Sequence, residues 1–214
     1  MHGIIVFLGP SLDRAAAEAI LPAEYRPPAR RGDLLRAAEE GAGVIVLIDG
    51  VFHQEAAVAH REILAAVRRG TRVVGASSMG ALRAAEMDTL GMTGIGEVYR
   101  MYRSGELVSD DEVALVFDPQ SGIALSEPLV NIRFTLKAAL AEGVIDAAAH
   151  DALLAAARSL FYPNRTYPAM ASAAEAADPA ARARFAAWAE GHAVDRKRLD
   201  AIAALEYVAG LTRQ

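Results

Sequence analysis

Hydrophobic runs alternate with helical patterns along the first half of the chain. The runs are almost continuously apolar and end abruptly at a polar or turn residue; they lie at residues 4–8, 44–48 and 72–75, with a short extended piece at 25–28. Between them, one helical pattern follows Ser11, its predicted cap, through Ile20, and another covers residues 33–40. Buried strands that alternate with helices are typical of a parallel sheet covered on both faces. We therefore predict an α/β fold with an open, mostly parallel sheet of the Rossmann or flavodoxin type.

The pattern changes after Glu86. Residues 91–96 form a glycine-rich turn before an amphipathic stretch at 97–103, and residues 113–125 predict a β-hairpin. The rest is alanine-rich and helical, with candidate helices at 130–141, 146–160, 179–190 and 196–209 and breaks at 162–164 and 169–178. We expect an α/β core domain over residues 1–128, with its hairpin near 112–126, and an α-helical C-terminal region over 129–214 packed on that core.

Composition narrows the class of protein. The 214 residues carry a net charge of −5 and include no cysteine, which disfavours a nucleic-acid scaffold, a disulfide framework and thiolate chemistry. No apolar run approaches the roughly 18 residues that span a bilayer, and the first residues lack the charged start of a signal peptide. We expect a cytoplasmic protein that contacts neither membrane nor nucleic acid. Lysine chemistry has just two candidates, Lys137 and Lys197.

Neither a cofactor nor a metal ion is expected. The glycines of residues 91–96 have the wrong spacing for a dinucleotide fingerprint and follow no predicted strand. The acidic run at residues 110–112 could bind a hard cation, but it lacks the spacing of a calcium loop. A solvated turn is the favoured interpretation of that run.

Three segments are expected to converge on one crevice. Ligands of open parallel sheets lie outside the carboxyl ends of the strands. Gly9-Pro10-Ser11, residues 49–53 and Ser77-Ser78 each follow a predicted strand, and they are one βα unit apart. The sequence therefore predicts a ligand site formed by these three segments.

The segment Gly75–Glu86 carries the strongest chemical signal. Its two serines stand where a strand passes into a helix, between small residues, as in the nucleophile elbow of serine hydrolases. The match is imperfect, because Ala76 stands where the motif G-x-S-x-G has its first glycine. A structural interpretation has similar weight: small residues allow close packing, and a serine caps the helix. The sequence does not separate Ser77 from Ser78.

A serine nucleophile needs a base, and histidine is scarce. Only His53 and His60 lie in the loop and helix that follow the Asp49 strand. His60 could equally be a packed helix residue, and His53 an exposed loop residue. Arg83 and Glu86, three residues apart, either contact a substrate or simply pair with each other.

Seven segments, in this order, resemble the TfuA-like family. They are FLGPSL (7–12), PPARRGDL (27–34), VIVLIDGVF (44–52), HREIL (60–64), GASSMGALRAAEM (75–87), GMTGIGEVY (91–99) and DDEVALV (110–116). The resemblance covers roughly the first 130 residues. It implies a partner role in peptide thioamide formation, because TfuA-like proteins accompany YcaO enzymes, which use ATP to activate a backbone amide oxygen so that a sulfur nucleophile can replace it.

Joined to the serine motif, the resemblance implies a hydrolase of a ThiS-like sulfur-carrier protein. Ser78 or Ser77 attacks the carrier's C-terminal thiocarboxylate, and amides near Met79 and Gly80 hold the oxyanion. The base is His60 or His53, oriented by Asp49 or Glu62. The expected substrate-binding residues are Gly9, Pro10, Ser11, Met79, Gly80, Arg83 and Glu86. Contact with the precursor peptide is indirect, and a homo-oligomer is one option for the assembly.

Two other functions stay open at this point. The first is a non-catalytic adaptor that docks on YcaO and recruits the sulfur donor, with the serine loop binding a carboxylate or phosphate without attacking it. The second is a small-molecule or nucleotide-phosphate hydrolase on a flavodoxin-like sheet.

Overall fold

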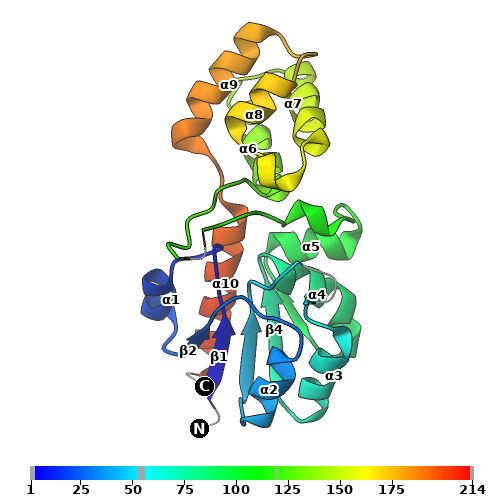
Figure 1. The fold of residues 1–214 in the computed structure, drawn as a ribbon, viewed down its shortest axis with the longest axis vertical. Helices are drawn as coiled ribbons and strands as arrows, with labels where there is room; N and C mark the ends of the chain where they lie inside the picture. Colours follow the sequence, from blue (N-terminus) through cyan, green and yellow to red (C-terminus); the bar gives the residue numbers. More distant parts are fainter. Residues whose placement is uncertain (1–2, 53–55, 119, 213–214) are drawn as a thin grey trace. The chain divides into compact units, whose positions relative to one another are not determined.

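The chain forms two compact units in the computed structural model, which describes residues 3–52, 56–118 and 120–212 (Figure 1). Unit 1 comprises Met1–Asp110 and Lys197–Gln214, and unit 2 comprises Asp111–Arg196. The expected division at residue 128 separates the C-terminal helix from the sheet. The structure groups that helix with the sheet, and it groups residues 111–128 with the other helices.

Unit 1 contains a five-stranded parallel sheet. Its strands are β1 (Ile4–Phe7), β2 (Glu24–Arg26), β3 (Val44–Leu47), β4 (Arg72–Ala76) and β5 (Thr93–Ile95). They lie in the order β2-β1-β3-β4-β5, and every neighbouring pair is parallel. The predicted open, parallel α/β sheet is confirmed.

Helices cover both faces of this sheet, as the apolar strands predicted. In β3, Ile45 packs in a cluster with α2 (Asp33–Glu39), α3 (His60–Arg68) and α4 (Met79–Met87). The next residue, Val46, packs in a second cluster with α1 (Arg14–Ile20) and α10 (Arg196–Thr212). Alternate residues of one strand thus enter opposite cores, because successive side chains of a strand point to opposite faces. Each face buries apolar surface, so the sheet has no solvated side.

Two local predictions in unit 1 were wrong. The cap of α1 is Asp13, whose carboxylate accepts a hydrogen bond from the Ala16 N–H at 2.8 Å, and not Ser11. The glycine-rich segment 91–96 contains β5, which pairs with β4. Gly94 leaves room for the Tyr99 ring of α5 (Glu97–Ser104), which a Cβ at this position would meet at 2.2 Å.

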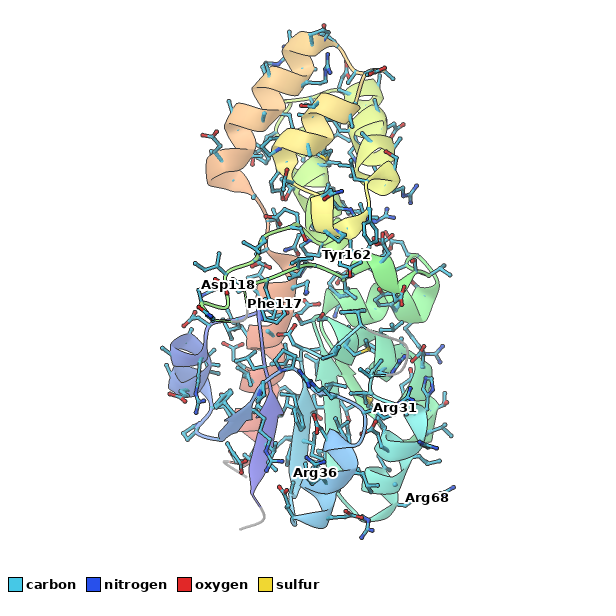
Figure 2. The ribbon with its side chains drawn as sticks, in the orientation of Figure 1. Arg31, Arg36, Arg68, Phe117, Asp118 and Tyr162 are labelled. Carbon is cyan, nitrogen blue, oxygen red and sulfur yellow. The ribbon has the colours of Figure 1, made fainter. Side chains whose placement is uncertain are left out.

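Unit 2 is built from helices. They are α6 (Leu129–Ala141), α7 (Ala147–Ser159), α8 (Tyr167–Ala173) and α9 (Pro179–His192), which share one apolar core around Phe185 and Leu153. The predicted break at 169–178 was wrong in its first part, since α8 continues to residue 173. The predicted hairpin is reduced to one antiparallel bridge between Phe117 and Ala124 (Figure 2).

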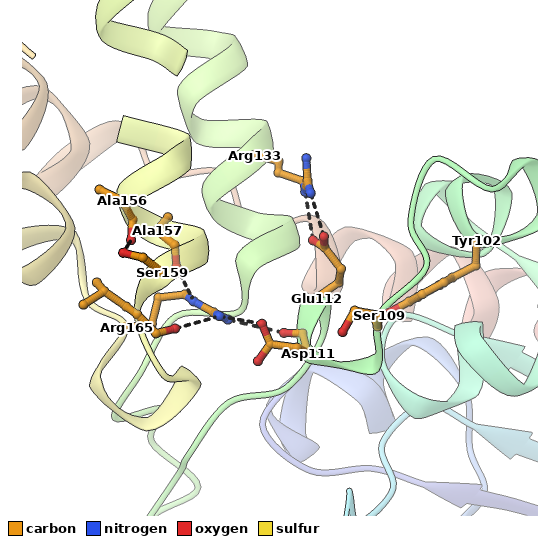
Figure 3. A network of polar contacts seen from close by, with 10 residues as sticks. Tyr102, Ser109, Asp111, Glu112, Arg133, Ala156, Ala157, Ser159 and Arg165 are labelled. Atoms are coloured by element: carbon orange, nitrogen blue, oxygen red, sulfur yellow. Dashed lines mark hydrogen bonds and ion pairs between the residues drawn. The ribbon is translucent and has the colours of Figure 1, made fainter. Parts of the chain in front are cut away.

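The acidic run leads into ion pairs within unit 2 (Figure 3). Asp111 accepts a hydrogen bond from Arg165 at 2.6 Å, and Glu112 accepts two from Arg133 at 2.8 and 2.6 Å. Arg165 is fully buried and also donates to the carbonyls of Ala157 and Leu160. These two carboxylates are therefore paired with guanidinium groups. Within the described chain, no group of three His, Cys, Asp or Glu residues is placed to hold a metal ion.

The structure predicts opposite effects on stability when either of two helical glycines of unit 1 is replaced by alanine. A Cβ at Gly80 would lie 1.7 Å from the Leu47 carbonyl oxygen, whereas a Cβ at Gly210 would meet nothing within 4 Å. We expect Gly80→Ala to destabilise unit 1 by about 3 kcal/mol or more, and Gly210→Ala to stabilise it by about 0.5–1 kcal/mol. Native-state hydrogen exchange of the β3 and β4 amides measures both changes. Equal effects of the two substitutions would contradict the close approach of α4 to β3.

Candidate functional site

A buried carboxylate ties the loop after β1 to the end of β3. Asp49 accepts hydrogen bonds from the Gly9 N–H at 2.8 Å, from the Ser11 N–H at 3.1 Å and from the Ser11 hydroxyl at 2.7 Å. Only 2% of Asp49 is exposed. Two of the three segments expected at the crevice therefore meet, with Pro10 between the anchored residues. Both carboxylate oxygens of Asp49 accept these hydrogen bonds, so its contacts in this structure hold the loop after β1 in place.

The turn between β4 and α4 has an unusual backbone. Ser77 has φ = +68°, and no other non-glycine residue in the described ranges has a positive φ. The Ser78 N–H donates to the Ala76 carbonyl at 2.8 Å, which closes a three-residue γ-turn around Ser77. The positive-φ form of this turn is rare and strained. Such strain persists only where the surrounding structure enforces it.

Close packing of α4 provides that enforcement. A Cβ at Gly75 would lie 2.2 Å from the Gly80 carbonyl oxygen, and one at Gly50 would lie 2.8 Å from Cγ of Met79. The first turn of α4 therefore sits directly against the ends of β3 and β4. The chain has no room for a gradual bend and must reverse at Ser77.

The two serines differ in their backbone, since Ser77 has a positive φ and Ser78 has not. Both are buried, Ser77 at 0% and Ser78 at 2% exposure. The Ser77 hydroxyl has no hydrogen-bond partner in the described part of the chain. A buried polar group without a partner costs about 1–3 kcal/mol, so this hydroxyl is available to a bound group. The sequence alone did not distinguish it from Ser78.

The amides at the start of α4 are partly occupied. The Gly80 N–H donates to the Ile48 carbonyl at 3.3 Å, and the Ser78 N–H is held in the γ-turn. The Met79 N–H has no hydrogen bond within the described residues. It lies at the positive end of the helix dipole, where developing negative charge is favoured. Of the two amides expected to hold an oxyanion, Met79 is the one that is open.

His60 lies in a different cluster. Its Nε2 is 2.7 Å from Glu86 Oε2, and Glu86 also accepts from Arg83 at 2.6 Å. Glu86 follows Ser78 by eight residues, which is about 12 Å of helix rise. The structure thus joins His60, Arg83 and Glu86 at the far part of α4 rather than at the serine turn. His53 lies outside the described residues.

This cluster borders a pocket of about 260 Å³. Arg31, His60 and Arg83 contribute its basic side chains, and Val58 and Met79 are among its apolar ones; Arg31 is labelled in Figure 2. Arg83 is fixed there by a second hydrogen bond, from its Nε to the Val58 carbonyl at 2.8 Å. Asp110 also lines the pocket, so its described lining carries charges of both signs.

Glu62 holds two helices together. Its carboxylate accepts hydrogen bonds from the backbone N–H groups of Ala59, Gly32 and Leu34 at 2.7, 2.9 and 3.2 Å. It is 4% exposed. The observed contacts of Glu62 are therefore with the starts of α2 and α3, not with a histidine.

Two charged residues that the sequence argument did not assign to the site lie on the buried face of α10. Asp200 is fully buried; its Oδ2 accepts from the Val98 N–H at 2.7 Å, and its carboxyl group fills the space beside Gly96. Lys197, three residues earlier, is 2% exposed. A signal was present: both stand on the helical stripe that continues through residues 201, 204, 205 and 208, where only apolar residues are expected.

Comparison with known protein families identifies the chain. The sequence model of the family described as TfuA-like protein matches residues 49–166, more than half of the chain. The chain belongs to the TfuA-like family. The matched range includes Asp49, the β4–α4 turn and the His60 cluster, and it ends before α10. No curated protein matches the chain.

Family membership gives the general role. This TfuA-like protein is an accessory protein of backbone thioamide formation, and its family is associated with a YcaO partner. In the described residues, no helix is long and apolar enough to cross a membrane.

The strained turn predicts an unusual effect of glycine. Replacing Ser77 with glycine removes both the positive-φ penalty and the unpaired hydroxyl, which outweighs the flexibility that glycine adds to the unfolded chain. We expect Ser77→Gly to stabilise unit 1 by about 1 kcal/mol. Ser78 has φ = −114°, so Ser78→Gly should destabilise it by about 0.5–1 kcal/mol.

Hydrogen exchange of the β4 amides measures both variants on the same probe. A Ser77→Gly protein that is less stable than Ser78→Gly would contradict the strained turn.

Proposed function

We propose that this TfuA-like protein supplies sulfide for thioamide formation by hydrolysing the C-terminal thiocarboxylate of a ThiS-like sulfur-carrier protein. Ser77 is the nucleophile. The observation that carries this choice is its hydroxyl, which is buried without a partner in the described ranges, on a strained turn that ends a strand and begins a helix. A nucleophile elbow has the same three parts: a sharp turn, an available hydroxyl and a following helix.

The neighbouring groups supply what acyl transfer requires. When the Ser77 oxygen adds to the thiocarboxylate carbon, negative charge develops on the carbonyl oxygen. The open Met79 N–H and the start of α4 stabilise that charge, an effect worth about 10²–10³ in rate for one well-placed donor. The loop of Gly9, Pro10 and Ser11, anchored by Asp49, forms the other wall of the crevice and contacts the carrier's tail.

The pocket beside Arg83, which Met79 also lines, is proposed to bind part of the substrate. Arg31, His60 and Arg83 outnumber the acidic Asp110 among its described lining residues, which suits an acidic group of the carrier. His60 belongs to this binding pocket, because its imidazole is paired with Glu86. YcaO then receives the sulfide, and contact with the precursor peptide occurs through YcaO.

An adaptor function is the second candidate, and burial of the serines favours it. Ser77 and Ser78 are 0% and 2% exposed, so a carrier tail can reach them only if the crevice opens. In the adaptor function, the protein docks on YcaO and recruits the sulfur donor without breaking a bond.

Sulfide release separates the two functions. With a thiocarboxylated carrier, we expect Ser77→Ala to lower the rate of sulfide release by about 10³-fold or more, because the nucleophile is lost. Ser78→Ala, the matched control one residue away, should retain at least about a tenth of the rate. A sulfide-sensitive fluorescent probe follows both reactions.

Free sulfide in excess provides the decisive control. The hydrolase function predicts that sulfide restores thioamide formation to the Ser77→Ala protein with YcaO. Two results together would favour the adaptor. The Ser77→Ala protein would release sulfide at the wild-type rate, and thioamide formation would require the protein even in excess sulfide.

A further inference from the structure

The pocket beside Arg83 has a charged, exposed rim and a buried apolar floor. Its rim includes three exposed charged or ionisable side chains: Arg31, His60 and Asp110. Its floor includes three side chains that are less than a tenth exposed: Ala57, Val58 and Met79. Of these, Met79 begins α4, two residues after Ser77. The pocket therefore reaches the residue whose amide stabilises negative charge in the proposed reaction.

The Met79 side chain is buried, but it lies outside the two apolar cores that flank the sheet. In the described part of the chain, neither the cluster around Ile45 nor the cluster around Val46 includes it. Its Cβ and Cγ lie over Gly50 instead, since a Cβ at Gly50 would be 3.1 and 2.8 Å from them. Gly50 comes shortly after β3. The Met79 side chain thus occupies space at the carboxyl ends of the strands, where ligands of open parallel sheets bind.

The side chain of Met79 is freer to move than its backbone. The first turn of α4 is held against β3, because the Gly80 N–H donates to the Ile48 carbonyl at 3.3 Å. A methionine side chain is unbranched and has three rotatable bonds, so it adapts to new neighbours more readily than a branched one. Ser77 is 0% exposed, so some group must move before a substrate reaches it. Met79 is the large, adaptable side chain nearest to it along the chain.

We propose that Met79 is the gate of the site and its specificity-determining residue. The carrier's tail crosses the charged rim of the pocket, and the methionine side chain swings off Gly50 to open the way to Ser77. The space that opens is that of a single side chain, so the last residue of the tail must be small. The pocket volume of about 260 Å³ suits a thin, extended tail, because it lies below the roughly 300–1,000 Å³ of most small-molecule sites.

This inference rests on the proposed function for its substrate, but movement of the gate can be tested without sulfide release. The first test observes the Met79 methyl group by NMR, in protein labelled with carbon-13 at its methionine methyl groups. Loss of one signal in Met79→Leu assigns the Met79 methyl group. A synthetic tail peptide that ends in glycine, with an ordinary carboxylate, is then added to the wild type and to Ser77→Ala.

We expect the Met79 signal to shift by more than its line width in both proteins, because the gate opens before any bond changes. The signal of Met170, which is fully buried in unit 2, should stay in place and serves as the internal reference. A Met79 signal that does not move at millimolar peptide would overturn the gate.

The second test measures how residue 79 changes the preference for small tails. The quantity compared is sulfide release from peptide thiocarboxylates that end in glycine and in alanine. We expect the wild type to prefer glycine by about 10–200-fold, and Met79→Ala by less than about threefold, because truncation leaves room for the extra methyl group. Met79→Leu keeps the volume of the side chain and should keep the preference.

Met87→Ala is the matched control. Met87 lies on the same helix, is 3% exposed and packs in the core with Ile45, and it is not among the described residues that line the pocket. Its truncation destabilises unit 1 but should leave the preference for glycine unchanged. Thermal unfolding shows how much of each variant is folded, and a ratio of two rates does not depend on that amount. A wild-type preference in Met79→Ala, or a relaxed one in Met87→Ala, would overturn the assignment.

The two tests keep failure of the gate apart from failure of the proposed function. Sulfide release without a preference for glycine, together with an unmoved Met79 signal, refutes the gate and leaves the hydrolase standing. A shifted Met79 signal in a protein that releases no sulfide from either peptide refutes the hydrolase. The gate then stands for a tail that is held without being cleaved.

Discussion

The packing of α4 against the ends of β3 and β4 is the constraint on which the site depends. Side chains are absent from Gly75 and Gly80 because backbone atoms occupy the space that a Cβ would need. The helix therefore starts immediately after the strand, and Ser77 takes the positive φ that links them. Among the described residues, the same close approach leaves the Ser77 hydroxyl without a partner and the Met79 amide open at the start of the helix. Backbone geometry, rather than a cluster of unusual side chains, makes this turn distinctive.

Carboxylates position the elements around that turn. Asp49 anchors the loop after β1, Glu62 joins the starts of α2 and α3, and Asp200 holds the start of α5 from the opposite layer. Each accepts backbone N–H groups while buried, so each replaces water as the partner of amides at a loop or helix start. The acidic residues near the site thus act mainly as structural ligands of the backbone, and this role distinguishes them from the orienting carboxylate of a catalytic triad.

Much of the fold could be predicted from the sequence, because the strands β1, β3 and β4 are apolar runs buried on both faces. The β5 strand was missed because it has only three residues, one of them glycine, and its burial is only partial. Ser11 looked like a helix cap because cap preference does not reveal a distant carboxylate such as Asp49. The convergence of Ser11 and Asp49 could be predicted from the order of strands and helices. The pairing of His60 with Glu86 and the packing of α10 on the sheet could not, because both are long-range contacts that local sequence patterns do not encode. Lys197 and Asp200 were visible as charges on an apolar stripe, yet their partners depended on that packing.

The central claim is that Ser77 carries the acyl group of the carrier during sulfide release. Its most direct measurement is intact-mass spectrometry of the protein, acid-quenched during turnover of a thiocarboxylated carrier, followed by peptide mapping. The account predicts a transient species heavier by the carrier's acyl group, without the sulfur, with the ester on Ser77. An adduct that retains the sulfur, an ester on Ser78, or sulfide release with no covalent species at any quench time would contradict it.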